Sequence, residues 1–77
     1  MKRLTLYSRP GCHLCELLLE ELAPLLGQEA LVETVDVEDD PELERRYGLR
    51  IPVLVSDGVE LSSYPLDRAR VERFLAE

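Results

Sequence analysis

Long apolar runs are missing from this chain of 77 residues. The longest ones, such as residues 17–19, fall far short of the roughly 20 residues that span a membrane. Lys2 and Arg3 give the chain a basic start like that of a signal peptide. However, Ser8, Arg9 and Pro10 interrupt the apolar pattern before a hydrophobic segment can form. We therefore expect a cytoplasmic protein that makes no contact with a membrane.

Positive charge is also scarce, because 9 Lys and Arg residues stand against 16 Asp and Glu residues and the net charge is −7. A nucleic-acid-binding protein needs basic residues to displace counterions from phosphate, so we expect no nucleic-acid partner. The hydrophobic content of 45% is too high for a disordered chain. A chain of this length predicts one domain over residues 1–77 with a small core, and we expect a monomer.

Only two cysteines are present, Cys12 and Cys15, and two residues separate them. On a helix, positions i and i+3 share one face about 5–6 Å apart, which suits closure of a disulfide. The first thiol would lie at the positive end of the helix dipole, where the pKa of a cysteine can fall from about 8.5 to between roughly 3.5 and 7.5. In a reducing compartment, such a pair is more often catalytic, redox-sensing or metal-binding than structural.

A metal site is the main alternative for these thiols. A closed structural zinc site needs four ligands, whereas the chain offers two Cys and one His, and His13 directly follows Cys12. Cu(I) held by two thiolates, or an iron–sulfur cluster shared by two chains, stays open as an alternative function in metal binding or delivery. A redox-sensing domain with little turnover is a third candidate. We predict no bound metal.

The hydrophobic pattern predicts the element order β-α-β-α-β-β-α, an α/β arrangement. An apolar stripe defines the first helix, in which Pro24 predicts a kink or an early end. The expected strands cover residues 3–8, 30–37, 51–56 and 59–61, and the expected helices cover residues 12–26, 41–47 and 67–77. The stripe consists of Leu14, Leu17, Leu18, Leu22, Leu25 and Leu26, and the second strand contributes Leu31, Val35 and Val37 to the core.

Strand–helix–strand at the start implies parallel pairing, and the Asp57–Gly58 turn implies an antiparallel hairpin. The expected fold is a four-stranded mixed sheet with helices on both faces. In such a sheet, the start of the first helix lies at the carboxyl end of the first strand, where open α/β sheets usually place their active sites.

This order, the Cys-x-x-Cys at the first strand–helix junction and a Pro at the start of the third strand together resemble the thioredoxin fold. Within it, the chain is most similar to very short glutaredoxin-like proteins. Residues 6–12 resemble the approach to the glutaredoxin active site, and residues 47–52 resemble the segment with the cis-proline of the fold. The resemblance implies that Cys12 is the nucleophile, Cys15 the resolving thiol and Pro52 the cis-proline.

Several neighbours complete the expected site. His13, with Pro10 and Gly11 in the turn before Cys12, is expected to tune the redox pair, because an imidazolium would stabilise a thiolate. The plain alternative for His13 is an exposed side chain with little effect. The backbone at Ile51, next to Pro52, offers an edge for an extended substrate.

Two arginines, Arg9 and Arg50, flank the proposed site. Either guanidinium is a candidate for a bidentate contact to a substrate carboxylate. The plain alternative for each is a solvated surface arginine.

The sequence departs from glutathione-dependent glutaredoxins at one place. Those proteins carry Gly-Gly and a polar pair after the hairpin, where this chain has Ser62, Ser63, Tyr64 and Pro65. The predicted function is a dithiol–disulfide oxidoreductase in cell redox homeostasis, without a bound organic cofactor. Its expected partners are a disulfide-containing protein or small-molecule thiol and a separate reductant, with glutathione only a possible co-substrate.

Overall fold

A computed structural model describes all residues from 1 to 77 and contains four strands, three α-helices and one short 3₁₀ helix. The order along the chain is the predicted one, with the 3₁₀ turn added after the second strand. The elements are β1 (Lys2–Ser8), α1 (His13–Leu26), β2 (Ala30–Asp36), η1 (Val37–Asp39), α2 (Pro41–Tyr47), β3 (Val53–Ser56), β4 (Val59–Ser62) and α3 (Arg68–Leu75).

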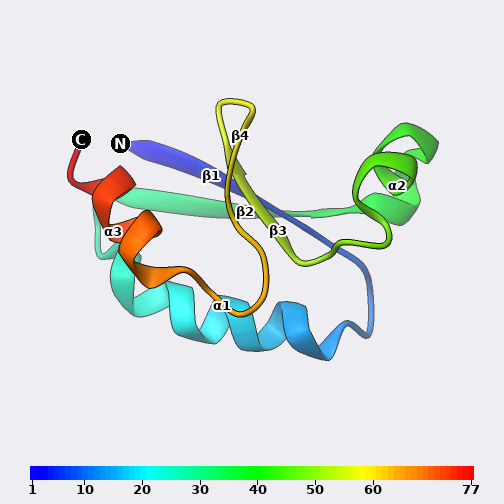
Figure 1. Ribbon diagram of the computed structural model, residues 1–77, viewed down its shortest axis with the longest axis horizontal. Coiled ribbons are helices and arrows are strands. Elements are labelled where there is room, and N and C mark those ends of the chain that lie inside the picture. The colour runs from blue at the N-terminus through cyan, green and yellow to red at the C-terminus, as the bar shows by residue number, and fades with distance from the viewer.

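The four strands form one mixed sheet in the order β2-β1-β3-β4. β1 pairs in parallel with β2 through the α1 crossover, and it pairs antiparallel with β3. Tyr7, near the end of β1, lies opposite Val53, the first residue of β3. This register brings the end of β1 and the start of β3 to the same edge of the sheet. Figure 1 shows the start of α1 and the whole of α2 at that end of the molecule, opposite the two chain termini.

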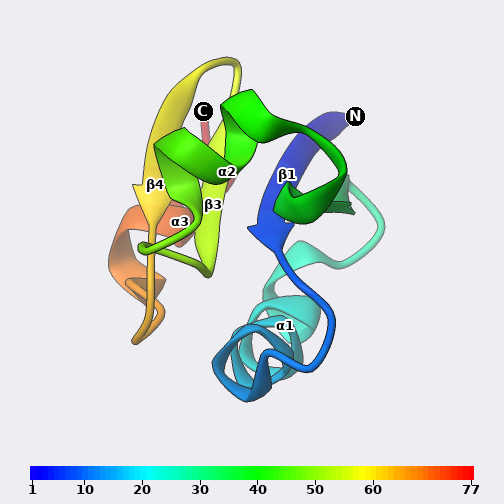
Figure 2. The same cartoon turned by 90° about the vertical axis from the view of Figure 1, so that its right-hand side faces the viewer.

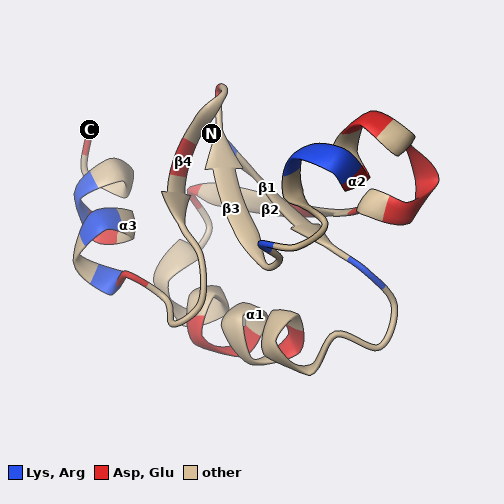
Figure 3. Ribbon diagram, turned by 45° about the vertical axis from the view of Figure 1, so that its right-hand side comes forward, with Lys and Arg blue, Asp and Glu red and all other residues tan.

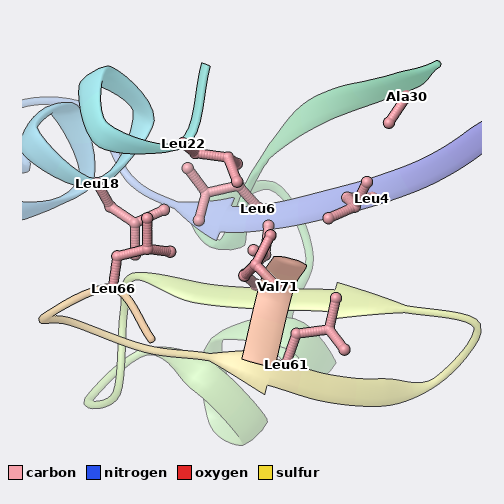
Figure 4. Packing of buried hydrophobic residues seen from close by; sticks show 9 residues of the cluster. Leu4, Leu6, Leu18, Leu22, Ala30, Leu61, Leu66 and Val71 are labelled. Carbon is pink, nitrogen blue, oxygen red and sulfur yellow. The ribbon is translucent and has the colours of Figure 1, made fainter. Parts of the chain in front are cut away.

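The main core lies between the sheet and the helices α1 and α3. Nine buried residues form it, and Figure 4 shows Leu18 and Leu22 of α1 facing Leu6 of β1, with Leu66 and Val71 beside them. Burial of a leucine side chain stabilises a fold by roughly 1.5–3 kcal/mol. The full cluster is Leu4, Leu6, Leu18, Leu22, Ala30, Leu54, Leu61, Leu66 and Val71.

A smaller cluster covers the other face of the sheet beneath η1 and α2. Val37 and Tyr47 pack there on Val53 and Val55 of β3. Figure 2 shows α2 and α1 on opposite sides of the strands, so helices cover both faces as expected. None of the helices combines the length and the apolar character that a membrane span requires.

Local signals explain the starts and ends of these helices. Asp40 accepts a hydrogen bond from Glu42 N–H as the N-cap of α2, and Pro41 follows at the first helical position. Asp67 caps α3 in the same way through Arg70 N–H. The chain turns between β3 and β4 at Asp57 and Gly58, both with positive φ. The Asp57–Gly58 turn was predicted from the sequence.

Several expectations about core residues and boundaries were wrong. Leu31 is exposed rather than buried. Its neighbour Ala30 faces the main core, so Leu31 points to the opposite face of the sheet. On that face it lies outside the cluster that packs beneath η1 and α2. Leu14 is also exposed, because the buried stripe of α1 runs through Cys15, Leu18 and Leu22 instead.

Of the kink or early end expected at Pro24, the early end does not occur, since α1 continues to Leu26. Pro24 has no N–H to donate to the carbonyl of Glu20, a residue that is exposed to solvent. β2 ends at Asp36 rather than at residue 37, because the Asp36 side chain caps η1. β3 begins at Val53, since Pro52 has no N–H to give to the ladder. α3 ends at Leu75, two residues before the expected end.

Candidate active site at the start of helix α1

A disulfide joins Cys12 and Cys15, whose Cα atoms lie 5.3 Å apart. Cys12 is the N-cap residue of α1, and its Sγ accepts a hydrogen bond from Cys15 N–H at 3.2 Å. Sulfur therefore takes the place that a Ser or Asp oxygen occupies at an ordinary helix start. This N–H and the positive end of the helix dipole are groups that favour negative charge at the Cys12 sulfur.

The two sulfur-bearing residues differ in accessibility. Cys15 lies in the buried stripe of α1 with an exposed fraction of only 3%, whereas Cys12 is half-buried. A molecule arriving from solvent therefore reaches Cys12 first. This asymmetry matches the roles of outer nucleophile and inner resolving thiol.

A tight turn connects β1 to this helix start. It runs through Pro10 and Gly11, and Gly11 has φ 78°, a conformation that side chains disfavour. Cys12 N–H then donates to Arg9 O at 3.2 Å. Pro10 and Gly11 thus set the position of Cys12 through the backbone.

Pro52 follows a cis peptide bond from Ile51, which confirms the expected cis-proline. It is fully buried and directly precedes Val53, the residue paired with Tyr7 at the end of β1. Neither the N–H nor the C=O of Ile51 makes a backbone hydrogen bond within the chain. A second cis bond joins Tyr64 to Pro65, and it was not predicted.

Arg9 is engaged within the chain. Its Nη2 donates to Gly48 O at 2.9 Å and lies 3.6 Å from a Glu44 carboxylate oxygen, while Nη1 lies 3.4 Å from Glu38. Glu38, Glu44 and Gly48 were not predicted to belong to the site. They lie 29 to 39 residues from Arg9, and no local pattern links such distant positions.

Arg50 forms an ion pair with Glu60 of β4, and its guanidinium lies 5.9 Å from the centre of the Tyr47 ring. The hydrogen bond and the charge of Glu60 raise the pKa of Arg50 above its ordinary value. Between Tyr47 and Arg50, Arg50 N–H donates to Tyr47 O, and Leu49 projects fully into solvent. Leu49 thus offers an exposed apolar side chain two residues before Ile51, and it was not among the predicted site residues.

His13 is an exposed member of the proposed site. Its side chain is 78% exposed, and Nδ1 lies 3.8 Å from a carboxylate oxygen of Glu16. Figure 3 shows that the acidic residues of α1 lie on the side of the helix away from the sheet. The His13 imidazole therefore lies in solvent, next to the negatively charged Glu16 carboxylate.

The segment after the hairpin is tied to the start of α3. Ser62 Oγ accepts a hydrogen bond from Asp67 N–H at 2.8 Å and donates to Ser63 O at 2.9 Å. The Ser62 hydroxyl therefore serves the fold at the position where glutathione-dependent relatives carry glycine. No group of three or more His, Cys, Asp and Glu side chains has the geometry to hold a metal ion.

Known proteins are similar to this chain over most of its length. Uncharacterized proteins of Mycobacterium tuberculosis (Rv0508) and Mycobacterium bovis (Mb0520) are each 35% identical to it over 77 residues, covering 92% of this chain and 79% of the relative. The X-ray structure of the structural-genomics target protein XcR50 from X. campestris is 40% identical, covers 95% of both chains and has a TM-score of 0.76. Its solution structure gives a TM-score of 0.75.

These structural neighbours confirm the thioredoxin-like fold. The family model of the Glutaredoxin-like domain (DUF836) matches residues 3–76, nearly the entire sequence. The chain therefore belongs to the glutaredoxin-like domain family.

Proposed function

We propose that this chain is a small dithiol–disulfide oxidoreductase, with Cys12 as the nucleophile and Cys15 as the resolving thiol. The observation that carries the proposal is the arrangement of the pair at the start of α1. Cys12 is accessible and faces a backbone N–H, and Cys15 lies buried behind it at a distance that permits a disulfide. Membership of a glutaredoxin-like family supports a redox role for these two residues.

The proposed reaction has two exchange steps. The Cys12 thiolate attacks one sulfur of a substrate disulfide, forms a mixed disulfide and releases the other substrate sulfur as a thiolate. The Cys15 thiolate then attacks the Cys12 sulfur, closes the Cys12–Cys15 bond and releases the second substrate thiolate. Two electrons pass to the substrate, and the released thiolates take up protons from water. A separate thiol reductant reverses the sequence and restores the pair.

The position of Cys15 favours the second step over attack by an outside thiol. The backbone of α1 holds the two Cα atoms 5.3 Å apart, so ring closure is intramolecular and needs little rearrangement. Because Cys15 is buried, thiols from solvent have little access to its sulfur.

A protein disulfide is the substrate class that the surroundings of Cys12 support best. The unpaired N–H and C=O of Ile51 favour an extended segment laid along the edge beside Pro52. Leu49 adds an exposed apolar side chain on the same loop. Glutathione is supported less well as the reductant, because Ser62 and the start of α3 already satisfy each other.

The test is thiol–disulfide exchange by the reduced protein with insulin and with oxidised glutathione, followed by mass spectrometry. Wild type should reduce insulin and end with the Cys12–Cys15 bond. Cys15→Ser should accumulate a mixed disulfide at Cys12, and Cys12→Ser should lose exchange. Undiminished exchange by Cys12→Ser, or no exchange by wild type, would reject the proposal. Reduction of insulin without equilibration with glutathione would point to a different reductant.

A further inference from the structure

We infer that Arg9 is a positioning residue, which holds the segment that carries Cys12 at a fixed distance from the segment that carries Pro52. The inference rests on the proposed function, because it concerns how Cys12 meets a disulfide laid beside Pro52. It assigns Arg9 a role within the protein, in place of the substrate contact expected from sequence.

The side chain of Arg9 has three acceptors on the neighbouring segment. Nη2 contacts Gly48 O and the Glu44 carboxylate, and Nη1 contacts the Glu38 carboxylate, at 2.9, 3.6 and 3.4 Å. Only 30% of the side chain is exposed. The planar guanidinium suits this set, because its donors are fixed in a fork that can meet several acceptors at once. Its charge is matched by two carboxylates.

The backbone of Arg9 is bound to the nucleophile. Arg9 O accepts the hydrogen bond from Cys12 N–H at 3.2 Å, across the Pro10–Gly11 turn. One residue therefore contacts Cys12 through its main chain and the end of α2 through its side chain. The other residues of the turn contribute no side-chain hydrogen bond to α2.

The Gly48 end of this link leads directly to Pro52. Gly48 is the C-cap of α2, and only Leu49, Arg50 and Ile51 separate it from the proline. A Cβ at Gly48 would lie 2.4 Å from Glu44 O and 3.1 Å from Arg9 Nη2, so the glycine leaves space for the helix carbonyl and for the guanidinium. The buried Gly48 carbonyl also gains a charged donor at the negative end of the helix.

Such a link would align the Cys12 sulfur with the substrate disulfide. Attack on a disulfide needs the nucleophilic sulfur held close to, and in line with, the bond that breaks. A misplacement of about 1 Å can slow a reaction roughly 100-fold. Loss of the Arg9 link should therefore slow exchange with a bound protein disulfide and leave the intrinsic reactivity of the Cys12 thiolate largely intact.

Arg9→Met tests this, with Arg45→Met as the matched control. Both changes remove one guanidinium paired with acidic residues of α2, but Arg45 lies on the exposed side, bound to Glu42. We expect Arg9→Met to lower kcat/KM for insulin reduction by roughly 10- to 100-fold. Alkylation of Cys12 by iodoacetamide between pH 5 and 9 should stay within about twofold of wild type. Arg45→Met should change neither rate, and Arg9→Lys should recover part of the loss.

Two results would overturn the inference. One is insulin reduction by Arg9→Met within about threefold of wild type. The other is an equal fall in alkylation and exchange, which would mean that Arg9 acts on the thiolate by charge. If Arg9→Met does not fold, the double variant Glu38→Gln and Glu44→Gln loosens the same guanidinium through two half-exposed carboxylates and should slow exchange in the same direction. Unchanged exchange by that double variant counts against Arg9 equally.

Amide hydrogen exchange of the oxidised protein separates this inference from the proposed function. Arg9→Met should lower protection at the hydrogen-bonded amides of residues 12, 48 and 50 relative to Arg45→Met. If wild type reduces no disulfide, the proposed function fails, and the protection data alone decide on Arg9. Unchanged protection at these residues would then overturn the link itself.

Discussion

Tyr7 of β1 and Tyr47 of α2 lie stacked, with ring centroids 4.3 Å apart and ring planes inclined by 11°. The guanidinium groups of Arg46 and Arg50 lie 5.4 and 5.9 Å from the centre of the Tyr47 ring. The stack fastens the end of α2 to the sheet at the edge that carries Pro52. The stack therefore supports the loop between α2 and β3, which Arg9 also contacts through Gly48 O.

Tyr47→Ala should destabilise the fold by about 3 kcal/mol, because it removes a buried ring and leaves a cavity above β3. For a domain of this size, the melting temperature should fall by roughly 12–24 °C. Urea unfolding followed by circular dichroism measures the change. A double-mutant cycle with Tyr7→Ala isolates the ring–ring contact, for which we expect a coupling of about 1 kcal/mol. Additive effects of the two substitutions would contradict a stabilising stack.

Oxidation of the pair should stabilise the chain modestly. The Cys12–Cys15 bond closes a loop of only four residues, for which the chain-entropy relation gives about 2 kcal/mol. We expect the melting temperature of the oxidised form to exceed that of the reduced form by roughly 8–16 °C. Cys12→Ser combined with Cys15→Ser is the control and should melt like the reduced protein. A more stable reduced form would show that thiolate stabilisation at the helix start outweighs loop closure.

His13→Ala should raise the pKa of reduced Cys12 and lower the reduction potential of the pair, if the imidazolium stabilises the thiolate. The effect should be small, with alkylation at pH 6 slowed by roughly twofold, because the His13 side chain is exposed and near Glu16. Glu16→Gln should act in the opposite direction. An unchanged thiolate titration curve in His13→Ala would leave His13 as a plain surface residue.

The pH profile of exchange should be independent of Arg50. Its pKa is raised in the folded chain, mainly by the hydrogen bond that its guanidinium donates to Glu60, so the stability that this shift contributes is fully present below the ordinary pKa of arginine. It is lost only as the pH rises through the raised folded value, in strongly alkaline solution. Arg50→Met should therefore keep the shape of the rate profile between pH 5 and 9. A new inflection in that range would contradict this.

Signals that act over a few residues could be read from the sequence. Asp40 with Pro41, Asp67, and the Asp57–Gly58 turn each fix an element boundary through neighbouring backbone groups, and the turn was predicted. The Cys-x-x-Cys spacing likewise predicted the disulfide geometry, since one helical turn sets it.

Features set by tertiary packing were missed. Exposure of Leu31 depends on how far α2 extends over the sheet, which the strand itself does not encode. The partners of Arg9 come together only when α2 packs beside the β1–α1 turn, so a substrate contact was the natural expectation for a basic residue near the thiols. β2 ends one residue earlier than predicted because Asp36 caps a 3₁₀ turn, and the apolar pattern does not predict such a turn.

Burial of Cys15 behind Cys12 also bears on oxidative damage. A peroxide that diffuses to the site meets Cys12 and converts its thiolate to a sulfenic acid. The inner thiol can then condense with it, releasing water and forming the same disulfide that the proposed reaction forms. Formation of the disulfide thereby protects the Cys12 sulfur from oxidation to the irreversible sulfinic acid. A thiol reductant can then reduce the disulfide and restore both thiols.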